Sequence, residues 1–438
     1  MRIGLYGGVA NNMYVMAKAL AETDHQVTFV RDVWDNYPFS QPVWEDMEFT
    51  LTYEEVADTD GFSRERWQEK EQLLGWIPPP YVKTPPWDQA WMNPSGKGFI
   101  GRCMRALARM RMLHLKHVND LLAQNDLLIV CGIDGAILAS RTGLPYIIWP
   151  HGGDIRLAAG LGSLPEKWRS QLVVRFKRAL LKRAFMNANF VGSHDPTGIG
   201  VHIGNMSFFL ERLRFGWLPI PLKERRRDER CMRLSCLNDL LSSLMGESVA
   251  GKLSAEELIC FIPSRVDFFW KGQDRLLRAL AGKGLPVFLI FAGWGQDYER
   301  ARVLARDFDL EDRTLFLPVA LSKPLLFKLF DSVDLVIDQF LFGSYGTSAV
   351  EAMAAGVPVM MAIDEQSWHR RGWLPPPVIN VSSEQEIAQA FIDILDGKID
   401  LDQCSQSVRE WFSQTHAYGS FFRYVNPLFE RIVKEHRK

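Results

Sequence analysis

Two series of short apolar segments run along the chain, and each segment is followed by a turn and a helical pattern. The first series predicts strands at residues 2–6, 26–30, 127–131, 145–149, 190–192 and 215–218. The second series predicts strands at residues 259–263, 287–292, 314–317, 335–338 and 357–361. Strands that alternate with helices build parallel sheets, because a parallel connection must cross over the sheet. The pattern therefore predicts an α/β fold with two Rossmann-like domains.

The length of the chain is consistent with this division. Its 438 residues exceed what one ordinary hydrophobic core accommodates. We expect a first domain over residues 1–222 and a second domain over residues 258–415. Residues 223–257 between them are polar and open with the charged run 223–227, so we expect an interdomain connection there.

Residues 34–95 interrupt the first series. They include the proline run 78–80, which excludes a continuous helix. They also hold six of the fourteen tryptophans: Trp34, Trp44, Trp67, Trp76, Trp87 and Trp91. We expect an ordered, aromatic-rich insertion, which either packs over one face of the domain or forms a wall of a ligand site.

Composition narrows the functional classes. The formal net charge of -1 removes the global attraction that nucleic-acid binding needs. The first residues lack a cleavable signal pattern, and no apolar run is long enough to span a membrane. The six cysteines show no CxxC pair, so we expect buried free thiols, no zinc site and a reducing compartment such as the cytoplasm.

The strongest local motif lies in residues 338–359. A strand ends near Asp338, a loop with glycines follows, and a helix begins near Thr347. The free N–H groups of a helix start favour a phosphate, and Glu351 lies one turn further on, where it can accept hydrogen bonds from two vicinal hydroxyls. The alternative is a plain strand–loop–helix corner with a solvated glutamate. The loop residues are Gly343, Ser344, Tyr345 and Gly346.

Two cations follow the first strand of the second series. Arg265 ends that strand. Lys271 lies six residues after Arg265 and is followed directly by a glycine. Two cations of this kind can stabilise the charge on a departing pyrophosphate without a metal ion. A pair of ordinary surface cations is the alternative for either residue taken alone.

These motifs resemble the donor domain of glycosyltransferase family four, which comprises retaining enzymes of the GT-B fold. Glu351 matches the family's ribose-binding glutamate, and residues 352–359 match its Ala-Met-Ala-x-Gly-x-Pro-Val run. The family's other loop glutamate contacts the donor sugar, and Gly343 stands at that position. This departure leaves open an altered sugar choice or an inactive relative. Further matches are Tyr345-Gly346, Arg265, Lys271-Gly272 and Gly293.

The resemblance implies two domains that face each other across a cleft, with the final helix, residues 418–438, packed back on the first domain. It implies a donor site in the second domain and a glycine-rich cleft loop at Gly7 and Gly8 near the donor phosphate. His151 is expected to point toward the donor sugar. On the acceptor side we expect Asn12, Asp154 and Arg156. The departing phosphate assists deprotonation of the acceptor in this family, so neither a protein base nor a metal cofactor is required.

Two basic arcs fall on predicted helices of the first domain. Ordinary solvated helix faces explain them, and so does contact with an anionic membrane surface or a phosphate-bearing lipid acceptor. The first arc comprises Arg102, Arg105, Arg109 and Lys116, and the second comprises Arg175, Arg178 and Lys182. His194 and Asp195 follow another strand of this domain, where a structural role is the alternative to a site role.

Together these features predict a hexosyl-type glycosyltransferase. It would move a sugar from a UDP- or GDP-sugar to a hydroxyl of a glycan or lipid-linked acceptor, in the assembly of cell-surface glycans. The expected location is the cytoplasm, with peripheral attachment to the inner face of the membrane as an option. One alternative is a non-catalytic nucleotide-sugar-binding or scaffold protein. An NAD-dependent oxidoreductase is another, supported by Asp32 after the second strand but lacking a dinucleotide fingerprint.

Overall fold

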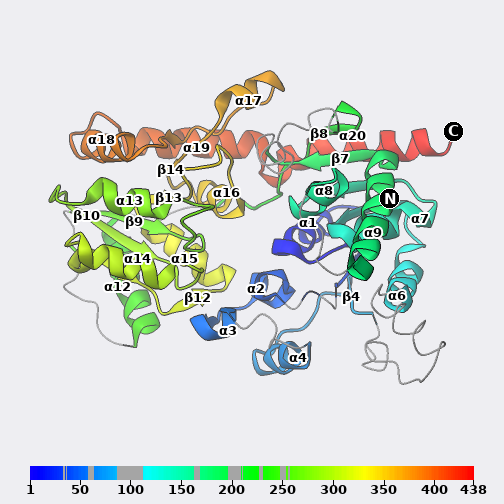
Figure 1. Ribbon diagram of the computed structural model, residues 1–438, viewed down its shortest axis with the longest axis horizontal. Coiled ribbons are helices and arrows are strands. Elements are labelled where there is room, and N and C mark those ends of the chain that lie inside the picture. Colours follow the sequence, from blue (N-terminus) through cyan, green and yellow to red (C-terminus); the bar gives the residue numbers. More distant parts are fainter. Residues whose placement is uncertain are drawn as a thin grey trace.

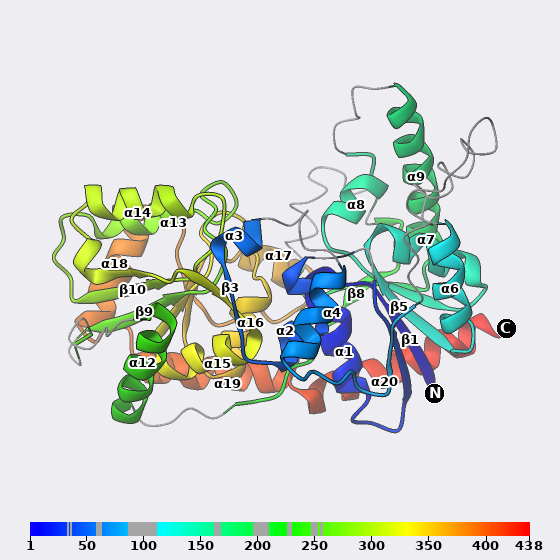
Figure 2. The ribbon, with the colours of Figure 1, turned by 90° about the horizontal axis from the view of Figure 1, so that it is seen from below.

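The computed structural model describes residues 1–32, 35, 37–57, 64–85, 112–161, 168–195, 209, 211–225, 230–246, 253–254 and 257–438. Figure 1 shows two α/β domains side by side, each built around one large sheet. Helices cover both faces of each sheet (Figure 2), which is the arrangement that the sequence predicts. The α/β fold with two Rossmann-like halves is thus confirmed.

The sheet of the first domain is parallel throughout. Within the described residues its strand order is β4-β2-β1-β5-β6-β7-β8. The strands are β1 (Arg2–Tyr6), β2 (Gln26–Val30), β4 (Val82–Lys83), β5 (Leu127–Cys131), β6 (Tyr146–Trp149), β7 (Phe190–Ser193) and β8 (Phe215–Trp217). Every side chain of β5 and β6 is buried, as expected for strands covered on both faces. The associated helices are η1 (Val9–Asn11), α1 (Asn12–Leu20), α6 (Met112–Leu122), α7 (Gly132–Thr142), α8 (Gly153–Ala158) and α9 (Trp168–Asn187).

The sheet of the second domain repeats this strand order without a counterpart of β8. It runs β11-β10-β9-β13-β14-β15 in parallel over β9 (Leu258–Ile262), β10 (Val287–Phe291), β11 (Thr314–Phe316), β13 (Leu335–Ile337), β14 (Val359–Met361) and β15 (Ile379–Asn380). Its helices are α13 (Gln273–Leu280), α14 (Tyr298–Asp307), η4 (Glu311–Arg313), α15 (Lys323–Ser332), α16 (Thr347–Ala354), α17 (Glu365–Arg370), α18 (Glu384–Leu395) and α19 (Leu401–Thr415). In both sheets the chain order reverses beside the first strand, at β1/β5 and at β9/β13. Ligands of doubly wound sheets bind at this switch point, outside the carboxyl ends of the strands.

The aromatic insertion connects the two domains. Its elements are η2 (Pro38–Ser40), α2 (Pro42–Asp46), β3 (Thr50–Thr52), α3 (Tyr53–Ala57) and α4 (Arg64–Leu73). Strand β3 pairs in antiparallel register with β12 (Val319–Leu321) of the second domain. Trp44, Trp67 and Trp76 are buried in one cluster with Ala320 of β12, which agrees with the packing alternative. Trp34, Trp87 and Trp91 lie outside the described residues.

The connection between the domains contains a helix that the sequence analysis does not anticipate. Helix α12 (Arg230–Met245) buries Leu237 and Leu241, and both side chains join a core cluster that includes residues of α15. These two leucines lie four residues apart on one helix face. The surrounding residues are polar, which hides this short apolar stripe in the sequence.

The last helix, α20 (Tyr418–His436), lies against the first domain (Figure 1). His25 Nε2 is 3.1 Å from Asn426 Oδ1, and Arg437 forms an ion pair with Asp126. The side chain of Phe421 is fully buried in a core cluster that includes residues of β1 and α1. Helix α20 therefore stabilises the domain that begins the chain.

The cysteines and the basic arcs are only partly as expected. Cys131 and Cys260 are buried, but Cys236 is exposed, because it lies on the solvent side of α12. Arg102, Arg105 and Arg109 lie outside the described residues. Lys116, Arg175 and Lys182 are exposed, whereas Arg178 is half-buried. No helix within the described residues is long and apolar enough to cross a membrane.

Candidate functional site

The predicted pyrophosphate lysine is held at the switch point of the second sheet. Lys271 Nζ lies 2.8 Å from Asp338 Oδ1, and Asp338 is fully buried at the carboxyl end of β13. The backbone N–H of Gly346 points at the other oxygen of Asp338 over 3.4 Å. A Cβ on Gly346 would lie 3.9 Å from Lys271 Nζ, so the lysine sits beside the start of α16. The ammonium and the helix start together form a site with the chemistry for an anion.

Arg265 lies nearby, on a second wall of the same region. It borders a cavity of about 340 Å³ whose other walls include Tyr37 and Tyr53 from the insertion and Trp294 from the loop after β10. The guanidinium is partly exposed and lies 3.4 Å from Asp267. The insertion, interpreted as a wall of the acceptor site, thus lines a cavity beside the predicted donor residues.

Glu351 is buried in a cluster of charges that spans both domains. Lys323 Nζ donates to Glu351 Oε1, while Glu351 Oε2 has no hydrogen-bond partner among the described residues. Burial raises the pKa of Glu351, and Lys323 opposes this shift. Burial also raises the pKa of Glu45 from α2, although Lys323 opposes the shift there too. Burial alone would lower the pKa of Lys323, but Glu351 and Glu45 reverse this and raise it. Glu351 Oε2 is thus a buried acceptor without a donor among the described residues.

Gly343 explains why the family's loop glutamate is absent here. Its φ is +62°, and a Cβ at this position would lie 2.9 Å from the backbone nitrogen of Asp364. A glutamate would meet both the left-handed backbone and this contact. The loop therefore takes a path that only glycine adopts without strain.

The rest of the loop touches the first domain. Ser344 Oγ donates to a carboxylate oxygen of Asp195, and Tyr345 Oη donates to the carbonyl oxygen of His194 at 2.7 Å. Tyr345 is buried and also lies 2.9 Å from His416 Nε2. The Tyr345 side chain therefore links the two domains. Thr347 is the first residue of α16, as predicted.

Two buried glutamines support these loops, and the sequence analysis did not single them out. Gln273 donates to the carbonyl oxygen of Arg265 and accepts from the N–H of Asp267. Gln339 accepts from the N–H groups of Leu341 and Phe342 at 2.8 Å each. Both glutamines stand directly beside a motif residue, Gly272 or Asp338, which is the signal that could have indicated them.

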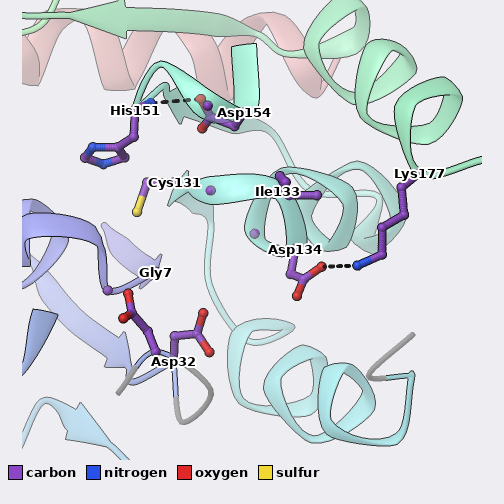
Figure 3. A pocket seen from close by; sticks show the side chains of 13 residues that line it. Gly7, Asp32, Cys131, Ile133, Asp134, His151, Asp154 and Lys177 are labelled. Carbon is purple, nitrogen blue, oxygen red and sulfur yellow. Dashed lines mark hydrogen bonds and ion pairs between the residues drawn. The ribbon is translucent and has the colours of Figure 1, made fainter. Parts of the chain in front are cut away.

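The first domain carries a separate cavity of about 460 Å³ at its own switch point (Figure 3). Gly7 and Gly8 follow β1, and Asp32 and Asp35 follow β2. Residues 131–135 form the end of β5 and the start of α7. His151 and Asp154 follow β6, and Lys177 reaches the cavity from α9. The structure therefore brings four of the predicted first-domain residues together: Gly7, Gly8, His151 and Asp154.

His151 and Asp154 are held by the start of α8. Asp154 Oδ1 accepts from the backbone N–H groups of His151 at 2.9 Å and Ile155 at 2.7 Å. Burial raises the pKa of Asp154 to about 6, although these backbone donors oppose the shift. Burial lowers the pKa of His151 to about 3, and His194 adds to the shift, so the imidazole is neutral at physiological pH.

The remaining predicted residues lie apart from these two cavities. Asn12 is buried at the start of α1, and Arg156 is half-buried in α8, and neither lines the cavity of the first domain. Gly293 follows β10 and packs on the backbone of residues 317–319, where a Cβ would lie 2.2 Å from Leu317 O. Within the described residues, no group of three histidine, cysteine or acidic side chains is placed to hold a metal ion.

Comparison with known proteins assigns the class. Residues 249–366 match the family of glycosyl transferases group 1, a segment that contains Arg265, Lys271, Gly343 and Glu351. Curated protein sequences gave no match. The chain is therefore a glycosyltransferase, as the sequence predicts, with a segment similar to the group 1 family over these residues, and the oxidoreductase alternative is set aside.

Solved structures agree on the fold across the whole chain. Anabaena HepE in complex with UDP is 17% identical, with a TM-score of 0.57, covering 98% of this chain and 100% of that one. Sucrose-phosphate synthase from Thermosynechococcus elongatus is 15% identical, with a TM-score of 0.61 and coverages of 99% and 100%. The catalytic domain of starch synthase IV from Arabidopsis thaliana, bound to ADP and acarbose, is 14% identical, with a TM-score of 0.58 and coverages of 99% and 99%. The two facing domains are thus those of the GT-B fold.

Proposed function

We propose that this glycosyltransferase moves a hexose from a UDP- or GDP-sugar to a hydroxyl acceptor with retention of configuration, in the assembly of cell-surface glycans. The observation that carries the proposal is the placement of Lys271 beside the start of α16, at the switch point of the second sheet. Arg265 adds a second cation on the neighbouring wall. Two cations and a helix start supply the charge and the N–H donors that a diphosphate needs.

The proposed chemistry is the one that the resemblance to retaining transferases implies. The bond between the anomeric carbon and the phosphate oxygen breaks, and the nucleoside diphosphate leaves with the electron pair. The acceptor oxygen forms the new bond on the same face, and its proton passes to the departing phosphate. Lys271, Arg265 and the N–H groups of α16 stabilise the negative charge that develops on the leaving group. Glu351 accepts hydrogen bonds from the ribose through its free Oε2.

The donor proposal has support from the structural neighbours. HepE was solved with UDP and with UDP-glucose, and the starch synthase was solved with ADP. A nucleotide that binds only the folded chain increases the free energy of unfolding by about 2.7 kcal/mol at one hundred times Kd, and thereby raises the melting temperature. We expect UDP or GDP to do so, and the matching nucleotide sugar to give a product whose anomeric configuration equals that of the donor by NMR. Absence of stabilisation by every nucleoside diphosphate, or an inverted product, would contradict the proposal.

A non-catalytic binding protein is the second candidate, and Gly343 favours it. The family's sugar-contacting glutamate is absent, and the local backbone leaves no space to restore it. A binding protein would be stabilised by the nucleotide sugar but would release neither product nor free nucleoside diphosphate with any acceptor. If nucleoside diphosphate is released only when an acceptor is added, the protein is an active transferase and not a binding protein.

Helix α9 supports docking on an anionic membrane surface, such as the inner face of a cell membrane. It exposes the apolar side chains of Leu172 at 55%, Val173 at 46% and Phe176 at 56%. Arg175 and Lys182 are exposed on the same helix. An apolar face flanked by cations is the combination that peripheral helices use.

Co-sedimentation with vesicles tests this docking. Binding should rise with anionic lipid content, fall with salt, and weaken in Phe176→Ser. The control is Phe269→Ser, which removes an exposed phenylalanine from the second domain. Equal binding to neutral and anionic vesicles, or an equal loss in both variants, would exclude α9 as the contact.

A further inference from the structure

We propose that the acceptor carries an ammonium group beside its reacting hydroxyl, as an amino sugar or an aminocyclitol does, and that it binds in the acidic cavity of the first domain. The proposal rests on the proposed function, since it names the class of acceptor for that reaction. It departs from the phosphate-bearing acceptor that the basic arcs suggest from sequence.

The charge of the cavity is the first argument. Four carboxylates line it, from Asp32, Asp35, Asp134 and Asp154, and Lys177 is the single cation among the described residues of the lining. Lys177 Nζ already lies 3.7 Å from Asp134 Oδ1 (Figure 3). Among the described residues, carboxylates thus outnumber cations around this cavity, and this excess favours a cation over a phosphate as its occupant.

An unpartnered buried oxygen is the second argument. Asp154 is only 4% exposed, and Oδ1 is held by the backbone. Its Oδ2 has no hydrogen bond of good geometry among the described residues, although the backbone N–H of Gly132 is near enough to lower the pKa of the carboxyl group. In Figure 3 the carboxyl group faces the cavity. A buried carboxylate oxygen without a donor is unfavourable, and an ammonium offers three donors. A ligand with N–H or O–H groups at this point would satisfy it.

His151 adds a neutral imidazole at the same end of the cavity. Its Nε2 is also buried without a partner, and its ring is uncharged at physiological pH. His194, which perturbs His151, lies with its ring 5.3 Å from the ring of Tyr345 in the predicted donor loop. The His151 end of the cavity thus adjoins the donor loop. We therefore place the reacting hydroxyl of the acceptor at this end and its ammonium group beside the other carboxylates.

The ammonium itself takes no part in the transfer. It stays protonated and fixes the acceptor, while the neighbouring hydroxyl forms the new bond and gives its proton to the departing phosphate. A divalent cation is a weaker occupant, because the described side chains form no group of three suitable metal ligands. A neutral polyol would use the same hydrogen bonds but would gain nothing from the excess of carboxylates.

Matched pairs of ligands test the proposal on the full chain. Hexosamines with the amine at C2, C3 or C6 and an aminocyclitol are titrated in the presence of UDP or GDP, each beside its N-acetyl counterpart and a hexose 6-phosphate. We expect at least one amine to bind about tenfold more tightly than its N-acetyl partner, as a charge-assisted hydrogen bond provides. The preference should shrink with added salt.

Three variants locate the effect. Asp32→Asn should reduce the preference for the amine, and Lys177→Ala should increase it, because the competing ammonium is removed. The exposed Asp312→Asn in η4 is the control for a carboxylate elsewhere. Variants that change in opposite directions cannot both be explained by loss of folding.

The outcomes separate this inference from the proposed function. If the nucleotide binds but no amine binds better than its acetylated partner, or the phosphate binds best, the acceptor class is wrong while the transferase proposal stands. Absence of binding by every amine also counts against it. If no nucleotide binds, the proposed function itself fails.

Discussion

The two sheets have the same strand order, apart from the additional β8 in the first, but carry opposite chemistry at their switch points. In the first sheet, the loops after β1, β2, β5 and β6 bring together carboxylates around a cavity. In the second sheet, the loops after β9 and β13 bring Lys271 and the start of α16 together around one buried carboxylate. The fold places a crevice at each switch point, and the residues of the loops determine the charge of its lining. Two copies of one architecture can therefore bind two unlike substrates.

The largest expected effect tests the cationic side of this comparison. Lys271→Ala should lower kcat by about 10²–10³-fold, because one charge-stabilising donor contributes about 3 to 4 kcal/mol to a transition state. Arg265→Ala should act in the same direction. Initial rates at saturating donor measure both, and the exposed Lys283→Ala is the control for loss of a surface lysine. Near-normal rates in the first two variants would place the leaving group elsewhere.

The next effect concerns nucleotide affinity. Glu351→Gln should weaken binding of the nucleoside diphosphate by about 10- to 100-fold, because a hydrogen bond to a charged group contributes about 1.5 to 3 kcal/mol. Asp154→Asn in the first domain should change this affinity much less. Calorimetry with free UDP or GDP measures both.

Glu45→Gln is the matched control for Glu351, because Lys323 interacts electrostatically with both carboxylates. It removes a neighbouring charge without removing the predicted ribose contact. Equal losses in the variants of Glu351, Glu45 and Asp154 would mean that the loop is misassigned.

The smallest effect concerns the path of the loop at Gly343. Gly343→Ala should lower the free energy of unfolding by about 1 kcal/mol more than Gly397→Ala does. Both glycines have a positive φ, +62° and +72°, so both variants carry the backbone strain. A Cβ meets Asp364 only at Gly343, and nothing lies within 4 Å at Gly397. Urea unfolding of the two variants measures the difference, and equal losses would show that the loop tolerates a side chain.

Much of the scaffold could be predicted from the sequence because its signals are local. The apolar runs of β1, β5 and β10 lie within one residue of the expected strands, and the glycine-rich loop before Thr347 marked the start of α16. The aromatic insertion was expected to be ordered, and its buried tryptophans agree. Helix α12 could not be identified, because Leu237 and Leu241 are isolated among polar residues.

The arrangement of the site depends on contacts between distant residues, which local patterns do not encode. Strand β3 pairs with β12 more than two hundred residues later, and this pairing brings the insertion beside Arg265. Asp338 was visible as the end of a strand, but its partner Lys271 is 67 residues away. The residues that line the acidic cavity come from the ends of four strands, which are far apart in the sequence. Its charge is therefore apparent only once the fold brings these residues together.

The comparison of the two sheets is tested most directly by measuring the binding of donor and acceptor separately in two variants. UDP or GDP and an amine-bearing acceptor are each titrated into Lys271→Ala and Asp32→Asn, with the unmodified chain as reference. The account predicts a crossed result, in which Lys271→Ala loses affinity for the nucleotide and retains the acceptor, while Asp32→Asn does the reverse. A result in which both variants lose the same ligand, or in which Asp32→Asn weakens the nucleotide more than Lys271→Ala does, would contradict the division of substrates between the two sheets.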